Sequence, residues 1–522
     1  MGIALILLVA ITVRAWILFS TPYMPGVNGA YYLVQARALL ERGSLGIPDM
    51  PLTFFLHAAL AWLMTSLGGL PRSDAIVLAV KVCDASLPAL VALPVFMLLR
   101  RWANDMGRGL GIPLAAAALA VLAPPWLLLV GELQKNSLAM VFLALLFLLL
   151  RDWLETPTPN RGLALLACLV PLGFTHIGVL GAALVLLAAT LAVFALQSGR
   201  RLRIGPQLPW LIAGIVILGI TSALVAWKFD PSRIERLITA LSDPSRFASD
   251  GRQGPMPPGG APFLDTWLPF LGFAAAVLPA LVIAWKRRAS MKHADLALIA
   301  GGALTVLAIT GPWLGMDKLL RFSIIALLPA IILVSFALLH IPSAKLRAGL
   351  IIIALALCSG ASITLIIPGG KAILDARTME ELKSLTPLIH DPAHTTIVTE
   401  HGVEWWSAWL LKVHIAQIEA ISSNNWKDGD AMLFLEVKAG RMELIGRGGP
   451  PNRPGGPQNR PEGNPGHSST GSPGSGSGSP PDRPPMIPPD AEILHDGKTL
   501  RLARVATPPD FPPGDRAIPR HN

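Results

Sequence analysis

The sequence predicts a polytopic α-helical membrane protein that carries a small α/β domain near its C-terminal end. Hydrophobic residues make up 52% of the 522 residues and charged residues only 15%, with a mean hydropathy of +0.54. A soluble domain carries about 25% charged residues. Many apolar runs approach or exceed the roughly 20 residues that cross a hydrocarbon core. After residue 367 the long apolar runs end, and short segments typical of strands and a soluble helix follow.

About eleven membrane-spanning helices are expected. They fall near 2–20, 75–99, 110–130, 137–150, 162–175, 177–196, 208–227, 263–285, 294–314, 319–340 and 346–367. The first run lacks a basic segment and a small-residue cleavage site, so it is expected to be retained as a span.

The apolar run 51–70 is ambiguous, because counting it as a span would place the basic loop at Arg100 outside and disturb every later loop. If 29–42 and 51–70 are outward loop helices, the Arg- and Lys-rich loops all fall inside. The positive-inside rule then predicts a cytoplasmic N-terminus and an extracytoplasmic C-terminus. Because the net charge of +10 follows this pattern, it predicts no nucleic-acid partner.

Three segments are expected after the transmembrane domain (1–367): a small α/β domain at 368–446, a disordered Pro/Gly/Ser-rich linker at 447–490, and a terminal β-hairpin and tail at 491–522. The α/β domain is predicted from the strand "TTIVTE" (Thr395–Glu400), the helix Val403–Ile418 and the strand Ala431–Gly440. The hairpin would turn at Asp496-Gly497. The linker then reads as an insertion between strands of one sheet.

Ionisable residues against a membrane are costly and usually face a cavity. Those expected at the outer ends of the spans, with their polar neighbours, are Asn28, Tyr31, Tyr32, Asp49, His57, Lys81, Glu132, Lys135, His176, Lys318 and Arg321. Acids and fixed cations from distant parts of the chain are therefore predicted to converge on one outward pocket.

The order of these segments resembles the GT-C superfamily of polyprenyl-phosphate-sugar-dependent glycosyltransferases, which includes protein mannosyltransferases and bacterial aminoarabinose transferases. The resemblance covers about residues 1–370. It rests on "NGAYYLVQARALLERGSL", "IPDMPLTFFLHAALAWLM", "KVCDASLPALVALPVFMLLRR", "GELQKN" and "DKLLRFSIIALLPA", which follow the first span in this order.

The resemblance implies an enzyme that transfers a sugar from a membrane polyprenyl-phosphate donor, outside the membrane and with inversion at the anomeric carbon. Lys318 and Arg321 match the family's basic turn for the donor phosphate, with Lys81 as a third candidate. The family normally presents an acid soon after the first span, but this chain has Asn28 there. If the chain is catalytic, the base must be Asp49 or Glu132.

Each candidate also has a purely structural interpretation. Asn28 is suited to cap a helix beginning at Gly29, Asp49 to a turn, and Glu132 to favourable charge at a helix N-terminus. Other candidate substrate-binding residues are Tyr31, Tyr32, His57, Lys135 and His176; the tyrosines also suit an interfacial belt and the histidines ordinary polar contacts.

Two other functions remain open on sequence alone: a catalytically inactive GT-C relative that acts in envelope polysaccharide assembly, and a membrane transporter. Transporters often show inverted repeats, and no such symmetry is seen here. No cofactor is predicted with certainty, and a divalent metal stays an open alternative. The expected location is a bacterial inner membrane.

Overall fold

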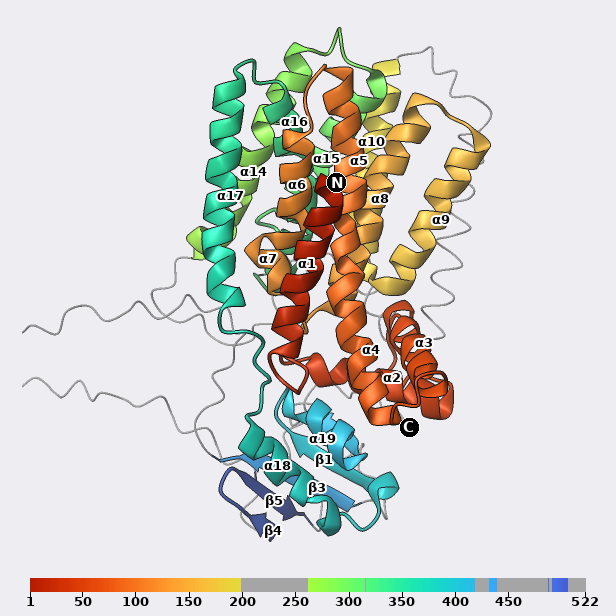
Figure 1. Cartoon of the computed structure of the whole chain (residues 1–522), viewed down its shortest axis with the longest axis vertical. Helices are drawn as coiled ribbons and strands as arrows, with labels where there is room; N and C mark the ends of the chain where they lie inside the picture. Colours follow the sequence, from red (N-terminus) through yellow and green to blue (C-terminus); the bar gives the residue numbers. More distant parts are fainter. Residues whose placement is uncertain (199–261, 315, 418–430, 439–486, 488–490, 506–522) are drawn as a thin grey trace, which may run out of the picture. The chain divides into compact units, whose positions relative to one another are not determined.

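The computed structural model describes residues 1–198, 262–314, 316–417, 431–438, 487 and 491–505. It divides into a helical unit, Met1–Ala372, and a second unit that begins at Ile373 (Figure 1). The expected span at 208–227, almost all of the expected linker and most of the C-terminal tail lie outside the described residues.

The helical unit contains α1 (Gly2–Phe19), α2 (Gly29–Arg42), α3 (Leu52–Ser66), α4 (Arg72–Ser86), α5 (Ala92–Asp105), α6 (Gly111–Leu122), α7 (Pro124–Leu127), α8 (Gln134–Glu155), α9 (Pro159–Thr175), α10 (Ile177–Ser198), α14 (Pro262–Lys286), α15 (His293–Ile309), α16 (Met316–Leu339) and α17 (Ala344–Ile366). The expected spans that fall on described residues are mainly helical, but the one expected at 110–130 is divided into α6 and α7, and the one expected at 294–314 ends at Ile309. Seven segments of the described chain are long and apolar enough to cross a membrane, among them the continuous α4–α5 rod. The chain is a multi-pass membrane protein, and the total of eleven spans stays a prediction.

The helices separate a lipid-facing surface from a packed interior. Side chains of α17 such as Ile352 and Leu357 are 65% and 70% exposed, as expected for a helix that contacts lipid. Between α10 and α15 the packing is close, because a Cβ added at Gly301 would lie 2.6 Å from the Cα of Thr190. Small residues at helix contacts are how membrane helices approach each other.

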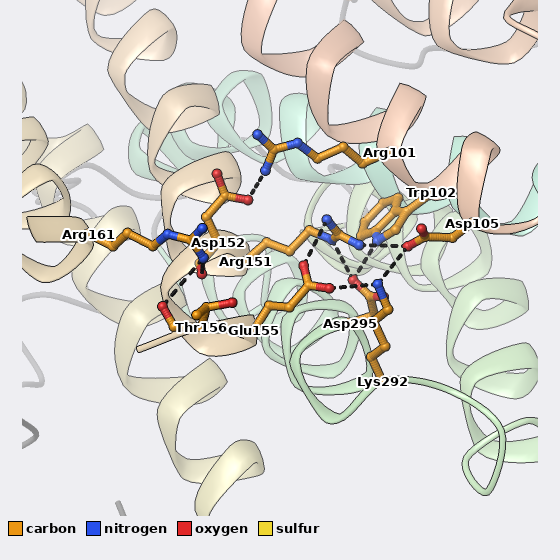
Figure 2. A network of polar contacts seen from close by, with 10 residues as sticks. All are labelled: Arg101, Trp102, Asp105, Arg151, Asp152, Glu155, Thr156, Arg161, Lys292 and Asp295. Carbon is orange, nitrogen blue, oxygen red and sulfur yellow. Dashed lines mark hydrogen bonds and ion pairs between the residues drawn. The ribbon is translucent and has the colours of Figure 1, made fainter. Parts of the chain in front are cut away.

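A network of ion pairs ties together the C-terminal ends of α5 and α8 and the N-terminal end of α15 (Figure 2). Arg151, only 2% exposed, donates to Asp295 at 2.7 Å and to Asp105 at 3.0 Å. The indole N–H of Trp102 also donates to Asp295 at 2.7 Å. Lys292 pairs with Glu155 at 2.6 Å. Hydrogen bonds and charge from Glu155 and Asp105 raise the pKa of Lys292, so it stays cationic.

The second unit contains a five-stranded sheet in the order β2-β1-β3-β5-β4. The elements are α18 (Ala376–Ser384), β1 (Thr395–Thr399), α19 (Val403–Leu411), β2 (His414–Gln417), β3 (Ala431–Val437), β4 (Glu492–Asp496) and β5 (Leu500–Arg504). Strand β1 is parallel to β2 and β3, and β5 is antiparallel to β3 and β4. The strands before and after the low-complexity segment therefore belong to one sheet.

Three sequence-based expectations need correction. The outward helix expected at 51–70 ends at Ser66, before Gly68 and Gly69. The helix expected over Val403–Ile418 ends at Leu411, where Lys412 adopts a left-handed conformation (φ 58°). Residues His414–Gln417 instead form β2, which pairs in parallel with β1. The third correction concerns Asn28, which forms no side-chain cap on α2.

Candidate active site

Helix α2 forms most of the segment between α1 and the loop that leads to α3. Its length, Gly29–Arg42, matches the sequence prediction, and Gly43 ends it in a left-handed conformation (φ 70°) that suits glycine. Gln35, which is fully buried, accepts from the N–H groups of Gly46 and Ile47 and donates to the carbonyl of Ile47. Because Gln35 holds these residues against α2, the adjoining Pro48 and Asp49 have a fixed direction.

Asp49 is 1% exposed and its carboxylate is fully engaged. One oxygen accepts from the Tyr31 hydroxyl and forms an ion pair with Lys135, and the other accepts from the Met50 N–H at 2.7 Å. Burial, then the charge of Asp49, raise the pKa of Tyr31 well above its usual value, so this hydroxyl remains a donor. Lys135 comes from α8, more than eighty residues away in sequence. This contact therefore joins two of the clusters found in the sequence.

Glu132 forms the second link between the same two segments. Its carboxylate accepts from the side-chain amide of Asn28 and from the Asn28 N–H, the latter at 3.0 Å. Glu132 and Asn28 are half-buried, so this carboxylate is more accessible than that of Asp49. The amide of Asn28 thus orients an acid next to the position where the family resemblance led us to expect one.

The two adjacent tyrosines lie between these acids. Tyr31 contacts Asp49, while the Tyr32 hydroxyl is 3.5 Å from the backbone oxygen of Glu132. The Tyr32 ring is edge-on to His57, with centroids 6.0 Å apart. Burial lowers the pKa of His57 to about 3, so its ring is neutral, and its Nδ1 has no partner among the described residues. A neutral imidazole can donate from one ring nitrogen and accept at the other, and a ligand hydroxyl can pair with either.

Lys81 and His176 have contacts within the protein. The Lys81 ammonium donates to the carbonyls of Thr21 and Pro22 at 2.7 and 3.3 Å, which holds the segment after α1 against α4. His176 precedes α10, and its Nδ1 accepts from the N–H of Val179 at 3.2 Å, as a helix cap does. Neither contact tests the ligand-binding roles expected from the sequence.

Lys318 and Arg321 lie in the first turns of α16, and Arg321 is exposed. No three His, Cys, Asp or Glu side chains of the described residues are arranged to hold a metal ion. The Asp49 carboxylate is paired with Lys135, which does not favour its use as a metal ligand.

The sequence did not identify Gln35. It predicts that Arg14, near the outer end of the first span, extends its charged end toward the membrane surface, but in the structure Arg14 is 2% exposed and forms an ion pair with Asp84. The signal for Gln35 is its place in α2, where it is flanked by buried Val34 and Ala36. Its hydrogen-bonding partners, Gly46 and Ile47, lie in the loop after α2. The sequence around Gln35 therefore does not predict which loop this side chain holds.

No protein-family model matches the chain, and neither does any of the curated proteins searched. Among solved structures, it is similar to ArnT from Cupriavidus metallidurans bound to undecaprenyl phosphate. The two share 14% identity over 83% of this chain and 92% of that one, with a TM-score of 0.52.

It also matches the Archaeoglobus fulgidus oligosaccharyltransferase in its apo form, at 14% identity and a TM-score of 0.48 over 83% of this chain and 69% of that one. In the complex of that enzyme with zinc and sulfate the match has 15% identity and a TM-score of 0.46, over 78% and 62% of the two chains. This chain thus spans about three-fifths of that enzyme in the latter match. The chain therefore shares its fold with ArnT, in agreement with the fold that the resemblance of the sequence predicts.

Proposed function

We propose that the protein is a membrane glycosyltransferase that moves a sugar from a polyprenyl-phosphate donor to an acceptor on the extracytoplasmic face of a bacterial inner membrane. One observation carries the proposal: two acids, Asp49 and Glu132, are bonded into a single polar site by Lys135, Asn28 and the tyrosines between them. The shared fold with ArnT, whose structure holds undecaprenyl phosphate, supports the donor class.

Glu132 is the better candidate for the general base. A base must be ionised, reachable by the acceptor hydroxyl and held in direction. Glu132 is half-buried and is oriented by neutral Asn28, whereas Asp49 is buried and has its charge offset by Lys135. In this assignment Asp49 fixes Tyr31 and Lys135 around the acceptor site and remains the second candidate for the base.

The reaction then follows from these groups. The acceptor hydroxyl oxygen forms a bond to the anomeric carbon as its proton passes to Glu132. The bond from that carbon to the phosphate oxygen breaks, and the polyprenyl phosphate leaves with the bonding electrons. Attack opposite the leaving group inverts the anomeric centre. Lys318, Arg321 and the remaining donor capacity of Lys81 are proposed to stabilise the phosphate charge.

Substrate contacts are proposed for Asn28, Tyr31, Tyr32, His57, Lys135 and His176. The aromatic rings of Tyr31 and Tyr32 suit the apolar face of a sugar, and the unpaired His57 Nδ1 suits one of its hydroxyls as donor or acceptor, according to the tautomer. The sugar and the acceptor are not specified by these contacts. A hexose or a pentose would satisfy them equally.

Purified protein incubated with radiolabelled polyprenyl-phosphate sugars tests the proposal. We expect Glu132→Gln to lower transfer by about a hundredfold or more, because removing a general base costs about 10²- to 10⁴-fold. Asp49→Asn should lower it less, through loss of positioning. If both variants keep full activity, the assignment of the base is wrong.

The same assay separates the alternatives. A wild-type protein that binds the donor without transferring sugar would be an inactive GT-C relative with an assembly role. Saturable uptake of solute into proteoliposomes, independent of any lipid-linked sugar, would indicate a transporter.

A further inference from the structure

A buried ion pair joins α1 to α4 inside the helical unit. The Arg14 guanidinium contacts the Asp84 carboxylate at 2.7 Å and also donates to the backbone oxygen of Asp84 at 2.9 Å. Both residues are 2% exposed. Taking two charges out of water is expensive, and well-packed apolar residues often do as well for stability alone. Such a pair therefore needs a reason beyond the packing of two helices.

The second oxygen of Asp84 supplies that reason. It accepts from the backbone N–H of Gly131 at 2.7 Å, and Gly131 is the residue directly before Glu132. Gly131 has a positive φ of 78°, and a Cβ at this position would lie 2.6 Å from the carbonyl oxygen of Pro25. The loop thus passes between α4 and the segment after α1 with no room for a side chain at this residue.

Gly26, in the segment after α1, packs equally closely against the side chain of Glu132. Gly26 has a φ of 85°, and a Cβ there would lie 2.6 Å from the Glu132 carboxylate. Its N–H donates to the carbonyl of Lys371 at 3.0 Å, so Gly26 is itself anchored. Asn28 then bonds the same carboxylate. Glu132 is held by Asp84 through its backbone neighbour and by Asn28 through its side chain.

We propose that the Arg14–Asp84 pair is a positioning device for Glu132: Arg14 fixes the Asp84 carboxylate, and Asp84 fixes the Gly131 peptide so that Glu132 faces the substrate. The proposal rests on the proposed function and adds two residues that do not touch the substrate. Helix α4 acts as the platform for both halves of the site. Lys81, one turn before Asp84, holds the segment after α1, and Asp84 holds the loop before α8.

A pair of double variants isolates the Asp84–Gly131 bond. Arg14→Met/Asp84→Asn keeps an oxygen that can accept from Gly131, whereas Arg14→Met/Asp84→Leu has none. Neither variant leaves an unpaired buried charge, and the two replacement side chains at position 84 are similar in size. Monodisperse elution and a cooperative melt establish folding, and Asp84→Ala replaces Asp84→Leu if the latter does not fold.

The first readout is independent of activity. Glu132→Cys is introduced into each double variant after Cys83, Cys168 and Cys358 have been replaced by alanine, and its rate of labelling by a charged maleimide is measured. We expect labelling about tenfold faster in the leucine variant than in the asparagine variant, the change that corresponds to losing one buried hydrogen bond. Equal rates in the two variants overturn the proposal.

The second readout is transfer activity with Glu132 intact. We expect kcat to be about tenfold lower in the leucine variant than in the asparagine variant, with the KM for the donor within about twofold, since a misdirected base affects the chemical step. Unequal labelling with equal kcat would also overturn a positioning role. If the wild-type protein shows no transfer, the proposed function fails, and the labelling ratio still decides whether Asp84 holds the loop.

Discussion

Asn28 bonds Glu132 through its side-chain amide and its backbone N–H, with the carboxylate bridging the two groups. The N-terminal turn of α2 receives no side-chain cap from it. The short amide group is therefore used for a contact across the site and not for its own helix. This is the residue-level basis for treating Asn28 as an orienting group, not as a sign of lost catalysis.

Substitutions at Asn28 test this role. Asn28→Ala removes the amide that orients Glu132, and we expect transfer about tenfold lower, from the loss of one hydrogen bond to a charged group. Asn28→Asp places a second carboxyl group beside Glu132. The two then compete for a proton, so the acid side of the pH–rate profile should move to higher pH. A profile for Asn28→Asp that coincides with that of the wild-type protein would contradict the contact.

Helix α8 connects the candidate active site to the ion-pair network of Figure 2. Lys135 in its first turn pairs with Asp49, and Arg151 near its other end pairs with Asp295. At about 1.5 Å per residue the two residues lie about 24 Å apart along the axis. Each end of α8 is thus fixed by charge to helices or loops that are distant in sequence.

In the ion-pair network at Arg151, the buried contact should contribute more to the free energy of unfolding than the exposed contact. Asp295→Asn leaves the buried Arg151 with weaker compensation, and we expect a loss of stability of about 3 kcal/mol, in the range for breaking a buried pair. Lys292→Met removes an exposed partner and should cost less than about 1 kcal/mol. Thermal melts of the two variants in the same detergent measure the difference. A larger loss of stability in Lys292→Met than in Asp295→Asn would contradict this prediction.

At the scale of the whole molecule, the α4–α5 rod, in which the two helices are joined by the short 3₁₀ turn Pro88–Val91, provides two ends whose sides of the membrane can be measured. It runs from Arg72 to Asp105 as a single candidate span of 34 residues. This is about 51 Å of helix at about 1.5 Å per residue, more than the roughly 30 Å hydrocarbon core. It is therefore long enough for its two ends to reach opposite sides of the membrane.

Orientation can be measured with one cysteine at each end of this rod. Ser73 and Asn104 are exposed at the start of α4 and the end of α5. In the background without native cysteines, we expect Ser73→Cys to react with an impermeant maleimide in sealed right-side-out vesicles. Asn104→Cys should react only after the vesicles are opened. The reverse pattern would place the candidate active site on the cytoplasmic side and contradict the proposed function.

The sequence alone indicated the membrane class, the approximate positions of the apolar helices and the limits of α2, because apolar run length and helix-ending residues such as Gly43 act locally. It also indicated the residues of the candidate site, since charge near a membrane is costly. The sequence predicted less well where contacts with other parts of the chain determine the secondary structure. β2 is a strand because β1 lies beside it, and the predicted helix Val403–Ile418 was too long for that reason.

Only the tertiary structure decided how the candidate residues are paired. Nothing local in the sequence links Asn28 to Glu132, Asp49 to Lys135, or Asp84 to Gly131, because each pair is separated by 47 or more residues and meets through helix packing. Hydrogen bonds and ion pairs act over about 3 Å, a distance set by the folded chain and not by its order. Composition therefore determines that this is a membrane protein. Helix packing determines which residue pairs with each acid of the candidate site and how that acid is oriented.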